Sequence, residues 1–308
     1  MRHLSDDSGI AVIIATRNRP AFLKDVVTAL EHQSLRPHIV VIADSSDEND
    51  AYLNRNLLVG RSLNIQYLAT ASKSLTRQKN LAIRTSLEID AVQFIQILDD
   101  DTVPDSDHLL TLRDTLMSLT GAVGVSGITL PRWSPPNTPR FIRAVFKFFG
   151  LDSDIPGSVT AAGIGIPIDT TSNRTQRSDW LYGCSMWRRF VFQRLEYEPD
   201  FVGSALFEDV EFSTRARALG ELFVNPRATL NHNVSEIGRP DSRTYAYRFV
   251  RNRLRVIRNL GTKRSILAYP LSTVLQMLVY LTKSSERRSL IQGTLRGLVD
   301  EVRRRPLL

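Results

Sequence analysis

Three consecutive aspartates, Asp99, Asp100 and Asp101, directly follow the apolar segment Val92–Leu98. Neighbouring like charges repel each other, so such a cluster needs water or a cation to offset the repulsion. Carboxylate oxygens are the ligands that hard cations such as Mg²⁺ and Mn²⁺ prefer. Aspartates are also common in solvated turns, where they hydrogen-bond to the backbone. On their own, the three aspartates therefore leave a metal site and a solvated turn equally open.

Other residues able to do chemistry are spread along the chain. Asp44 ends a second apolar run, and Glu208 and Asp209 form an acidic pair at the start of a predicted helix. A carboxylate can act as a general base, and Arg77 could bind phosphate through charge-assisted hydrogen bonds. The single cysteine, Cys184, excludes an internal disulfide framework and a cysteine-rich zinc site.

The segments around these residues have the patterns of buried strands and helices. Ile10–Ala15, His38–Ala43 and Val92–Leu98 are continuous apolar runs, which are typical of strands covered on both faces. Pro20 suits the first position of a helix, and Leu75–Leu87 has a helical pattern. This alternation predicts an α/β fold with helices on both faces of a mostly parallel sheet. Ligands of such sheets bind beyond the carboxyl ends of the strands, where the first four aspartates named above are expected.

The second half of the chain is less regular and its end is basic. Residues 131–177 are rich in Pro, Gly, Ser and Thr, whereas Phe207–Leu219 predicts a helix and Leu222–Leu230 a strand. From Arg239 to the end there are 16 Lys and Arg against 4 Asp and Glu, and the first 238 residues hold 24 against 28. This asymmetry predicts a main domain over residues 1–238 and a basic helical extension over residues 239–308.

Six short sequences, in this order, resemble the motifs of family 2 glycosyltransferases of the GT-A fold: AVIIATRNRP, VVIADSSD, LTRQKNLAI, ILDDDTVP, FEDVEF and NH. Each motif alone is weakly specific, whereas the ordered set is highly specific. Tyr245–Arg255 (YAYRFVRNRLR) further resembles the rhamnosyl- and galactofuranosyl-transferase-like branch. The resemblance implies a Rossmann-like catalytic domain, with a nucleotide-sugar half over about residues 1–130 and an acceptor half over about 131–238. It also implies an inverting, metal-dependent transfer of one sugar from a nucleotide-diphosphate sugar to a hydroxyl group.

The resemblance implies roles for individual residues on the donor side. Thr16 would line the nucleotide pocket, and Asp44 would accept a hydrogen bond from the imide N–H of the nucleotide base. Asp99 and Asp101 would be the outer members of an Asp-x-Asp (DXD) motif, with Asp100 between them in the nucleotide-sugar site. Asp101 would bind the divalent metal, Mn²⁺ or Mg²⁺, and Asp99 would hold the ribose or assist the metal.

Four further positions complete the implied site. Arg77 would lie near the base and the diphosphate. Asp209 would be the general base that takes the proton of the acceptor hydroxyl, with Glu208 supporting it, and His232 would complete the metal site. Structural alternatives stay open for all four: an arginine can pair on a helix surface, an acidic pair is favoured at a helix N-terminus, and a lone histidine is more often structural.

Departures from the family pattern leave the donor and the acceptor open. Ala15, Ala43 and Ser45 replace residues that are frequent in the family, so the donor could be of the UDP, dTDP or GDP type. The absence of a Gln-x-x-Arg-Trp motif argues against a processive polysaccharide synthase. A sugar-phosphate nucleotidyltransferase is an alternative, but the loop Thr16–Arg19 lacks the glycines of a phosphate loop. A nucleic-acid-binding protein is a second alternative, but the main domain is net negative, so no nucleic acid partner is expected.

The predicted helix Tyr245–Asn259 permits four interpretations. Its arginines could form a solvated cationic face, pair with the acidic domain or dock on an anionic membrane surface, or Arg251 and Asn252 could close over the donor or the acceptor. The apolar segment Ile266–Leu281 and the amphipathic segment Leu290–Arg305 favour docking. Docking suits a glycan or lipid-linked acceptor, which is common in the family, and a role in cell envelope polysaccharide biosynthesis. The sequence has no signal-peptide pattern and no run of about eighteen apolar residues. We therefore expect a cytoplasmic protein that is peripheral at the cytoplasmic face of the membrane.

Overall fold

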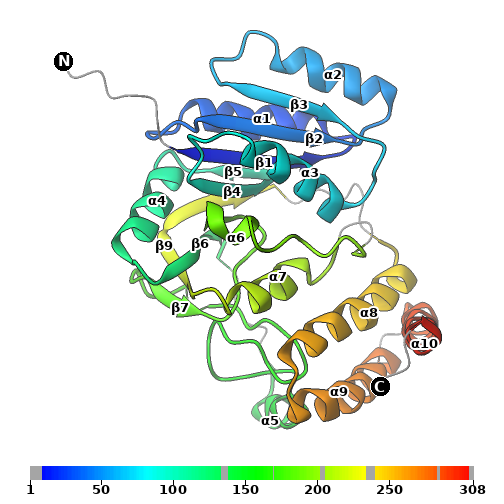
Figure 1. Cartoon of the computed structure of the whole chain (residues 1–308). Coiled ribbons are helices and arrows are strands. Elements are labelled where there is room, and N and C mark those ends of the chain that lie inside the picture. The colour runs from blue at the N-terminus through cyan, green and yellow to red at the C-terminus, as the bar shows by residue number, and fades with distance from the viewer. Residues whose placement is uncertain are drawn as a thin grey trace.

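The computed structural model describes residues 9–132, 138–168, 170–201, 205–233, 240–282 and 285–304. Its elements, in chain order, are β1 (Ile10–Thr16), α1 (Pro20–Glu31), β2 (Ile39–Asp44), α2 (Glu48–Leu58), β3 (Ile65–Ala69), α3 (Leu75–Leu87), β4 (Phe94–Asp99), β5 (Thr102–Pro104), α4 (His108–Ser118), β6 (Ala122–Leu130), α5 (Arg140–Phe148), β7 (Gln176–Ser178), β8 (Ser185–Arg188), α6 (Arg189–Phe192), α7 (Glu208–Ala216), β9 (Glu221–His232), α8 (Ser242–Leu260), α9 (Lys263–Leu281) and α10 (Arg287–Arg304). Figure 1 shows a central sheet surrounded by helices, with α8, α9 and α10 gathered at one end of the molecule.

The strands form one mixed sheet in the order β3-β2-β1-β4-β8-β6-β9-β5, and β7 also pairs with β9. The first four strands of this order run parallel, as predicted. Their register places Thr16 beside Asp44 and Ala15 beside Asp99. The carboxyl ends of β1, β2 and β4 therefore meet at one edge of the sheet, and the acidic residues lie at or just beyond this edge.

The alternation of side chains along β1 explains why its sequence is apolar without interruption. Ile10, Val12 and Ile14 belong to one buried cluster, and Ala11 and Ile13 belong to another. Successive side chains of a strand point to opposite faces of the sheet. Both faces of the sheet are thus covered, which confirms the prediction of a sheet enclosed by helices.

Several elements were not predicted, and their sequences explain why. Helix α2 has only Ala51 and Asn54 as buried residues, so its apolar periodicity is weak. Strand β6 contains Gly124 and Gly127, and glycine disfavours strands. A Cβ at Gly124 would lie 2.5 Å from the Trp187 ring, so the close packing of β6 against β8 requires this glycine.

Helix α9 contains Pro270 in its interior and continues through it. A proline inside a helix removes one backbone hydrogen bond. Pro270 lies on the exposed side of α9. On that side, the bending that accommodates a proline need not disturb the packing against α8.

Most arginines of α8 form ion pairs or hydrogen bonds within the protein. This finding corrects the expectation that they form a lipid-docking face. Arg251 and Arg258 pair with Glu301 of α10 at 3.0 and 2.8 Å. Arg255 lies 3.7 Å from Asp200. Arg253 is fully buried and donates a hydrogen bond to a threonine hydroxyl of α9.

Helix α8 packs against the preceding domain. Val256 of α8 shares a buried cluster with Trp180 and with Val210 of α7. The domain boundary near residue 238 stays a prediction. Among the residues that the structure describes, no helix is both long enough and apolar enough to cross a membrane.

Candidate active site

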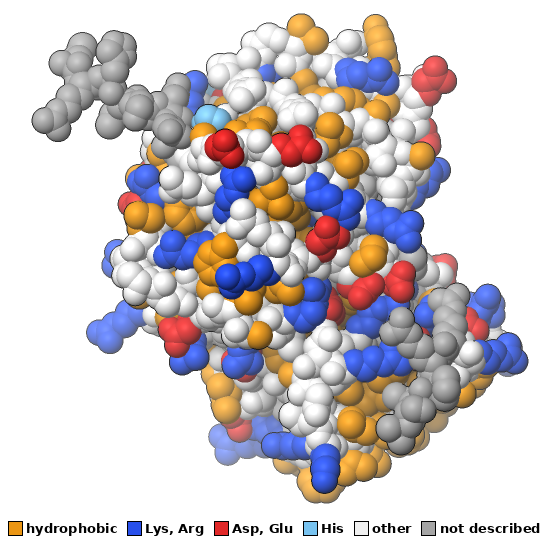
Figure 2. Space-filling model, in the orientation of Figure 1, with side chains coloured by type: hydrophobic (Ala, Val, Ile, Leu, Met, Phe, Trp, Pro, Cys, Tyr) orange, Lys and Arg blue, Asp and Glu red, His pale blue; other side chains and the backbone are white. Residues whose placement is uncertain are grey.

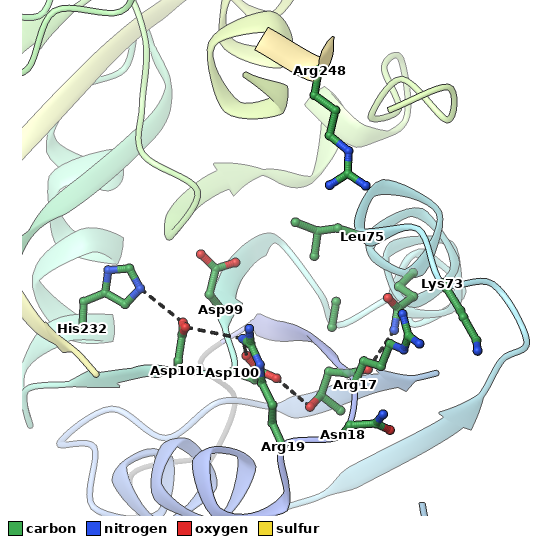
Figure 3. Close-up of a pocket in the computed structure, with 13 residues that line it drawn as sticks. Arg17, Asn18, Arg19, Lys73, Leu75, Asp99, Asp100, Asp101, His232 and Arg248 are labelled. Atoms are coloured by element: carbon green, nitrogen blue, oxygen red, sulfur yellow. Dashed lines mark hydrogen bonds and ion pairs between the residues drawn. The ribbon is translucent and has the colours of Figure 1, made fainter. Parts of the chain in front are cut away.

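A cavity of about 490 Å³ opens beyond the carboxyl ends of β1 and β4. This volume lies within the range of about 300–1,000 Å³ that is typical of small-molecule sites. Figure 3 shows the three aspartates on one side of the cavity and basic side chains around them. The lining residues are Ala15, Thr16, Arg17, Asn18, Arg19, Lys73, Leu75, Gln78, Asp99, Asp100, Asp101, His232 and Arg248.

Asp100 is held in place by residues of the loop after β1. Its carboxylate accepts a hydrogen bond from the Thr16 hydroxyl at 2.7 Å and one from the Arg19 guanidinium at 2.9 Å. Burial raises the pKa of Asp100 to about 6, although Arg19 and Thr16 act in the opposite direction. Asp100 therefore anchors the acidic segment to the loop after β1.

Asp101 faces His232 across the paired strands β5 and β9. The register of these strands places Thr102 opposite His232, and the His232 Nε2 atom lies 3.3 Å from an Asp101 carboxylate oxygen. The Arg19 guanidinium lies 3.4 Å from the other oxygen. A carboxylate and an imidazole that converge in this way suit a divalent cation such as Mn²⁺. Among the described residues, no group of three or more His, Cys, Asp and Glu side chains forms a metal site by itself.

Basic side chains from three segments surround the acidic part of the cavity. Arg17 and Arg19 come from the loop after β1, Lys73 comes from the loop before α3, and Arg248 comes from α8. Arg248 reaches toward the cavity from the side opposite Arg17 and Arg19 (Figure 3). A cavity that combines carboxylates with several cations suits a ligand that carries both a metal ion and phosphate groups.

Lys79 of α3 connects the cavity to the start of α7. Its ammonium group is buried, lies 2.8 Å from the Glu208 carboxylate and lies 3.5 Å from Asp99. Burial alone lowers the pKa of a lysine, but the two carboxylates outweigh this effect, and the pKa of Lys79 is raised. Gly183 lies close to the Asp99 carboxylate: a Cβ atom at this position would be 3.4 Å from it. Lys79 thus links Asp99, which lines the cavity, to Glu208.

The acidic pair lies at the N-terminus of α7, where the helix dipole favours carboxylates. Glu208 is buried, and Asp209 is partly exposed. Burial raises the pKa of both carboxyl groups, with Lys79 opposing this effect. The Asp209 carboxylate accepts a hydrogen bond from the Val210 backbone N–H at 2.8 Å. Neither residue lines the cavity itself, so the structure joins the pair to the cavity through Lys79 and Asp99.

Besides Glu208 and Asp209, two further predicted site residues do not line the cavity. Asp44 is buried, and its carboxylate accepts hydrogen bonds from the Ser46 backbone N–H, the Asn54 amide and the Tyr67 hydroxyl. Arg77 is exposed and donates a hydrogen bond to the backbone carbonyl of Pro199. Base recognition by Asp44 and diphosphate binding by Arg77 stay predictions.

No role was predicted for Lys79 from the sequence, although the helical pattern of α3 indicates that its side chain is buried. Residues two positions apart on a helix point about 200° apart around its axis. Because Arg77 faces outward, Lys79 faces the interior, within the buried stripe that also holds Ala82 and Ile83. A lysine at an apolar position of an amphipathic helix is expected to have a buried partner. The long-range partners Asp99 and Glu208 could not be read from the sequence.

We expect Lys79→Met to destabilise the protein by about 3–5 kcal/mol, because it leaves Glu208 buried without its cation. Urea denaturation would measure the loss in the free energy of unfolding. The matched control is Arg77→Met, which removes a cation two residues away on the exposed side of the same helix. The control should change stability by no more than about 0.5 kcal/mol. If both substitutions lowered the free energy of unfolding equally, the buried ion pair would not contribute more to stability than the exposed arginine does.

Solved structures with the same fold include several glycosyltransferases. GalNAc-T7 with UDP, GalNAc and Mn²⁺ matches with a TM-score of 0.59 and 14% identity, over 81% of this chain and 47% of that chain. The mannosyltransferase PcManGT from Pyrobaculum calidifontis, in complex with GDP-Man and Mn²⁺, matches with a TM-score of 0.55 and 16% identity, over 94% and 87%. Residues 1–349 of S. aureus TarS with UDP-GlcNAc match with a TM-score of 0.55 and 12% identity, over 92% and 79%. The chain thus spans less than half of the GalNAc-T7 chain, and no curated protein sequence matches it.

The fold and the site define an α/β protein of the GT-A class, with an acidic and cationic cavity at the carboxyl ends of its parallel strands. Residues 11–163 match the sequence profile of Glycosyl transferase family 2. This matched part, about half of the chain, forms a domain of the family. The resemblance found in the sequence motifs is thereby confirmed at the level of the family. The finer resemblance to rhamnosyl- and galactofuranosyl-transferases stays a prediction.

Proposed function

We propose that the enzyme transfers one sugar from a nucleotide-diphosphate sugar to a hydroxyl acceptor with inversion at the anomeric carbon. The observation that carries this proposal is the cavity in which Asp99, Asp100 and Asp101 face a set of basic side chains. The relatives support a nucleotide-sugar donor, because GalNAc-T7 and PcManGT were solved with UDP and with GDP-Man. The donor of this enzyme is of the UDP, dTDP or GDP type.

A divalent cation, Mn²⁺ or Mg²⁺, fits the residues on one side of the cavity. Asp101 and His232 would hold it, with Asp99 as a further ligand, since Asp101 and His232 already converge to 3.3 Å. Phosphate oxygens and water would fill the other positions, as is usual for Mg²⁺. When bound, the cation stabilises the negative charge of the nucleotide-diphosphate leaving group.

The chain itself supplies the remaining chemistry. Arg17, Lys73 and Arg248 bind and orient the diphosphate. Asp209 takes the proton of the acceptor hydroxyl, which attacks the anomeric carbon on the side opposite the leaving group. Lys79 fixes Glu208 beside this base through the 2.8 Å ion pair, so Glu208 supports the geometry of the base.

The acceptor is a glycan or lipid-linked precursor, and the enzyme acts in cell envelope polysaccharide biosynthesis at the cytoplasmic face of an anionic membrane. The exposed cations Lys263, Arg264, Arg287 and Arg288 support this placement, because anionic lipid surfaces attract Lys and Arg. No nucleic acid partner is proposed.

A thermal-shift screen of nucleotide-diphosphate sugars tests the donor class. A donor present at 100 times its Kd stabilises the folded enzyme by about 2.7 kcal/mol, which should raise Tm by several degrees. We expect the matching donor to need Mn²⁺ or Mg²⁺ for this effect. The same donors with a chelator serve as the control.

Stabilisation by a nucleoside triphosphate together with a sugar phosphate, and by no nucleotide sugar, would contradict the proposal. This result would indicate a sugar-phosphate nucleotidyltransferase instead.

A further inference from the structure

The outward side of α9 is apolar, whereas its inward side contains many polar groups. Ser265, Ser272 and Thr273 are buried, together with Tyr269 and Tyr280. The exposed side chains, which we call the outer face of α9, are Ile266, Leu267, Leu271, Val274, Leu278 and Leu281, with exposed fractions between 52% and 67%. A helix on a water-facing surface normally shows the opposite distribution. The outer face of α9 is therefore suited to an apolar environment.

Cations lie at both ends of this apolar helix. Lys263 and Arg264 are exposed in its first turn, and Arg287 and Arg288 are exposed at the start of α10, shortly after α9 ends. We call these four residues the cationic collar. Between residues 265 and 282 the sequence has no charged residue. An uncharged apolar face between cationic ends is the pattern of a helix that lies in the interface of an anionic membrane.

Helix α5 extends this arrangement. It has no buried residue, and Phe141 and Phe148 are 71% and 85% exposed. It lies at the same lower end of the molecule as the start of α9 (Figure 1). The lower end of the space-filling view shows orange side chains with blue ones beside them (Figure 2). Exposed phenylalanines next to cations are also common in interfacial helices.

Charge decides between a membrane and a second copy of the chain as the occupant of this face. In a two-fold dimer the same patch of both subunits meets. Such a dimer through the outer face of α9 would bring two cationic collars close together, and their repulsion would oppose association. Anionic headgroups neutralise the collar while the acyl region accepts the leucines and valines.

We propose that the outer face of α9 inserts into the interfacial region of an anionic phospholipid membrane, with the cationic collar on the headgroups. The cations of this surface are not the arginines of α8, which form ion pairs within the protein. The inference deepens the proposed function and rests on it for the membrane-associated acceptor. Helix α8 packs on α9 and also carries Arg248 to the cavity, so α8 connects the proposed membrane contact with the donor site.

Flotation of the full chain with lipid vesicles tests this inference. The vesicles contain phosphatidylcholine alone or phosphatidylcholine and phosphatidylglycerol in equal amounts. Leu267 and Leu271 lie one helical turn apart on the outer face, so the test variant is Leu267→Glu with Leu271→Glu. The matched control is Leu53→Glu with Val59→Glu at α2, which adds the same charge at two exposed apolar positions far along the chain.

We expect the wild-type chain and the control to float with the phosphatidylglycerol vesicles and not with phosphatidylcholine alone. The test variant should bind roughly tenfold or more weakly, because carboxylates are costly in the acyl region. All forms should keep the Tm of the wild type and the donor-induced thermal shift. Failure of the proposed function would remove the donor-induced shift from every form, which distinguishes it from a failure of this inference.

Equal flotation of the test variant and the wild type, or no flotation of the wild type, would overturn the inference. So would a wild-type dimer, seen by light scattering, that the test variant converts to a monomer while neither form binds vesicles. That result would assign the outer face of α9 to a second copy of the chain.

Discussion

Asp209→Asn is expected to lower kcat for sugar transfer by about 10²–10⁴-fold, which is the usual contribution of a positioned general base. Asparagine has nearly the shape of aspartate but cannot take the proton of the acceptor hydroxyl. Donor affinity should stay close to that of the wild type, because Asp209 does not line the donor cavity. Steady-state kinetics with a saturating donor, together with the donor-induced thermal shift, would measure both quantities.

The pH dependence of the rate provides a second measure of the same role. Burial raises the pKa of Asp209 above the ordinary aspartate value of 3.8. A base works only when it is deprotonated, so kcat/KM should be full above the raised pKa and fall as the pH decreases through it. The midpoint of this fall should thus lie above about 4, the ordinary range for aspartate.

Glu208→Gln is the comparison variant for both measurements. If Asp209→Asn keeps full activity and the wild-type pH profile, the general base lies elsewhere, and Glu208 is the first candidate. The structure favours Asp209, because one oxygen of Glu208 is already held by Lys79.

Asp101→Ala is expected to remove the dependence of donor binding on the divalent cation. Loss of a residue that only supports a metal ligand costs roughly 10–100-fold in metal affinity, so loss of a direct ligand should cost at least as much. The thermal shift with donor and Mn²⁺ should become the same as the shift with donor and chelator. Isothermal titration with Mn²⁺ in the presence of the nucleoside diphosphate would measure the change in affinity directly.

The matched control for Asp101→Ala is Asp107→Ala, which removes an exposed aspartate six residues away. The control should bind the donor and Mn²⁺ as the wild type does. Metal-dependent donor binding that survives in Asp101→Ala would refute the metal role of this residue. Taken with Asp209→Asn, the two variants should show opposite patterns: one loses donor binding, and the other loses transfer with donor binding intact.

Much of the donor half of the fold could be predicted because its sequence patterns are local. The apolar runs around β1, β2 and β4 predict buried parallel strands, and Leu75–Leu87 is a helix with the predicted bounds. Parallel strands end at one edge of a sheet. This rule predicted that Asp44 and the three aspartates from Asp99 to Asp101 lie at one edge, and the register of β1 with its neighbours confirms it for Asp44 and Asp99.

The parts that could not be predicted depend on contacts between distant segments. Lys79 meets Glu208 across 129 positions of the chain. His232 reaches Asp101 because β5 and β9 pair as antiparallel strands. Arg19 pairs with two of the three aspartates, although no role was predicted for it. No local pattern encodes such pairings, because they arise only when the sheet brings the segments together.

The sequence by itself determined the family, the parallel part of the sheet and the acidic segment at its edge, since apolar periodicity and motif order are properties of neighbouring residues. Only the tertiary structure decided which charges face the cavity. It turned Arg77 outward and Lys79 inward, because two helical positions lie on opposite sides of α3. It also paired arginines of α8 inside the protein and left the apolar side of α9 exposed. The side on which a charge or an apolar group lies depends on what packs against its helix, and that is settled only when the whole chain is folded.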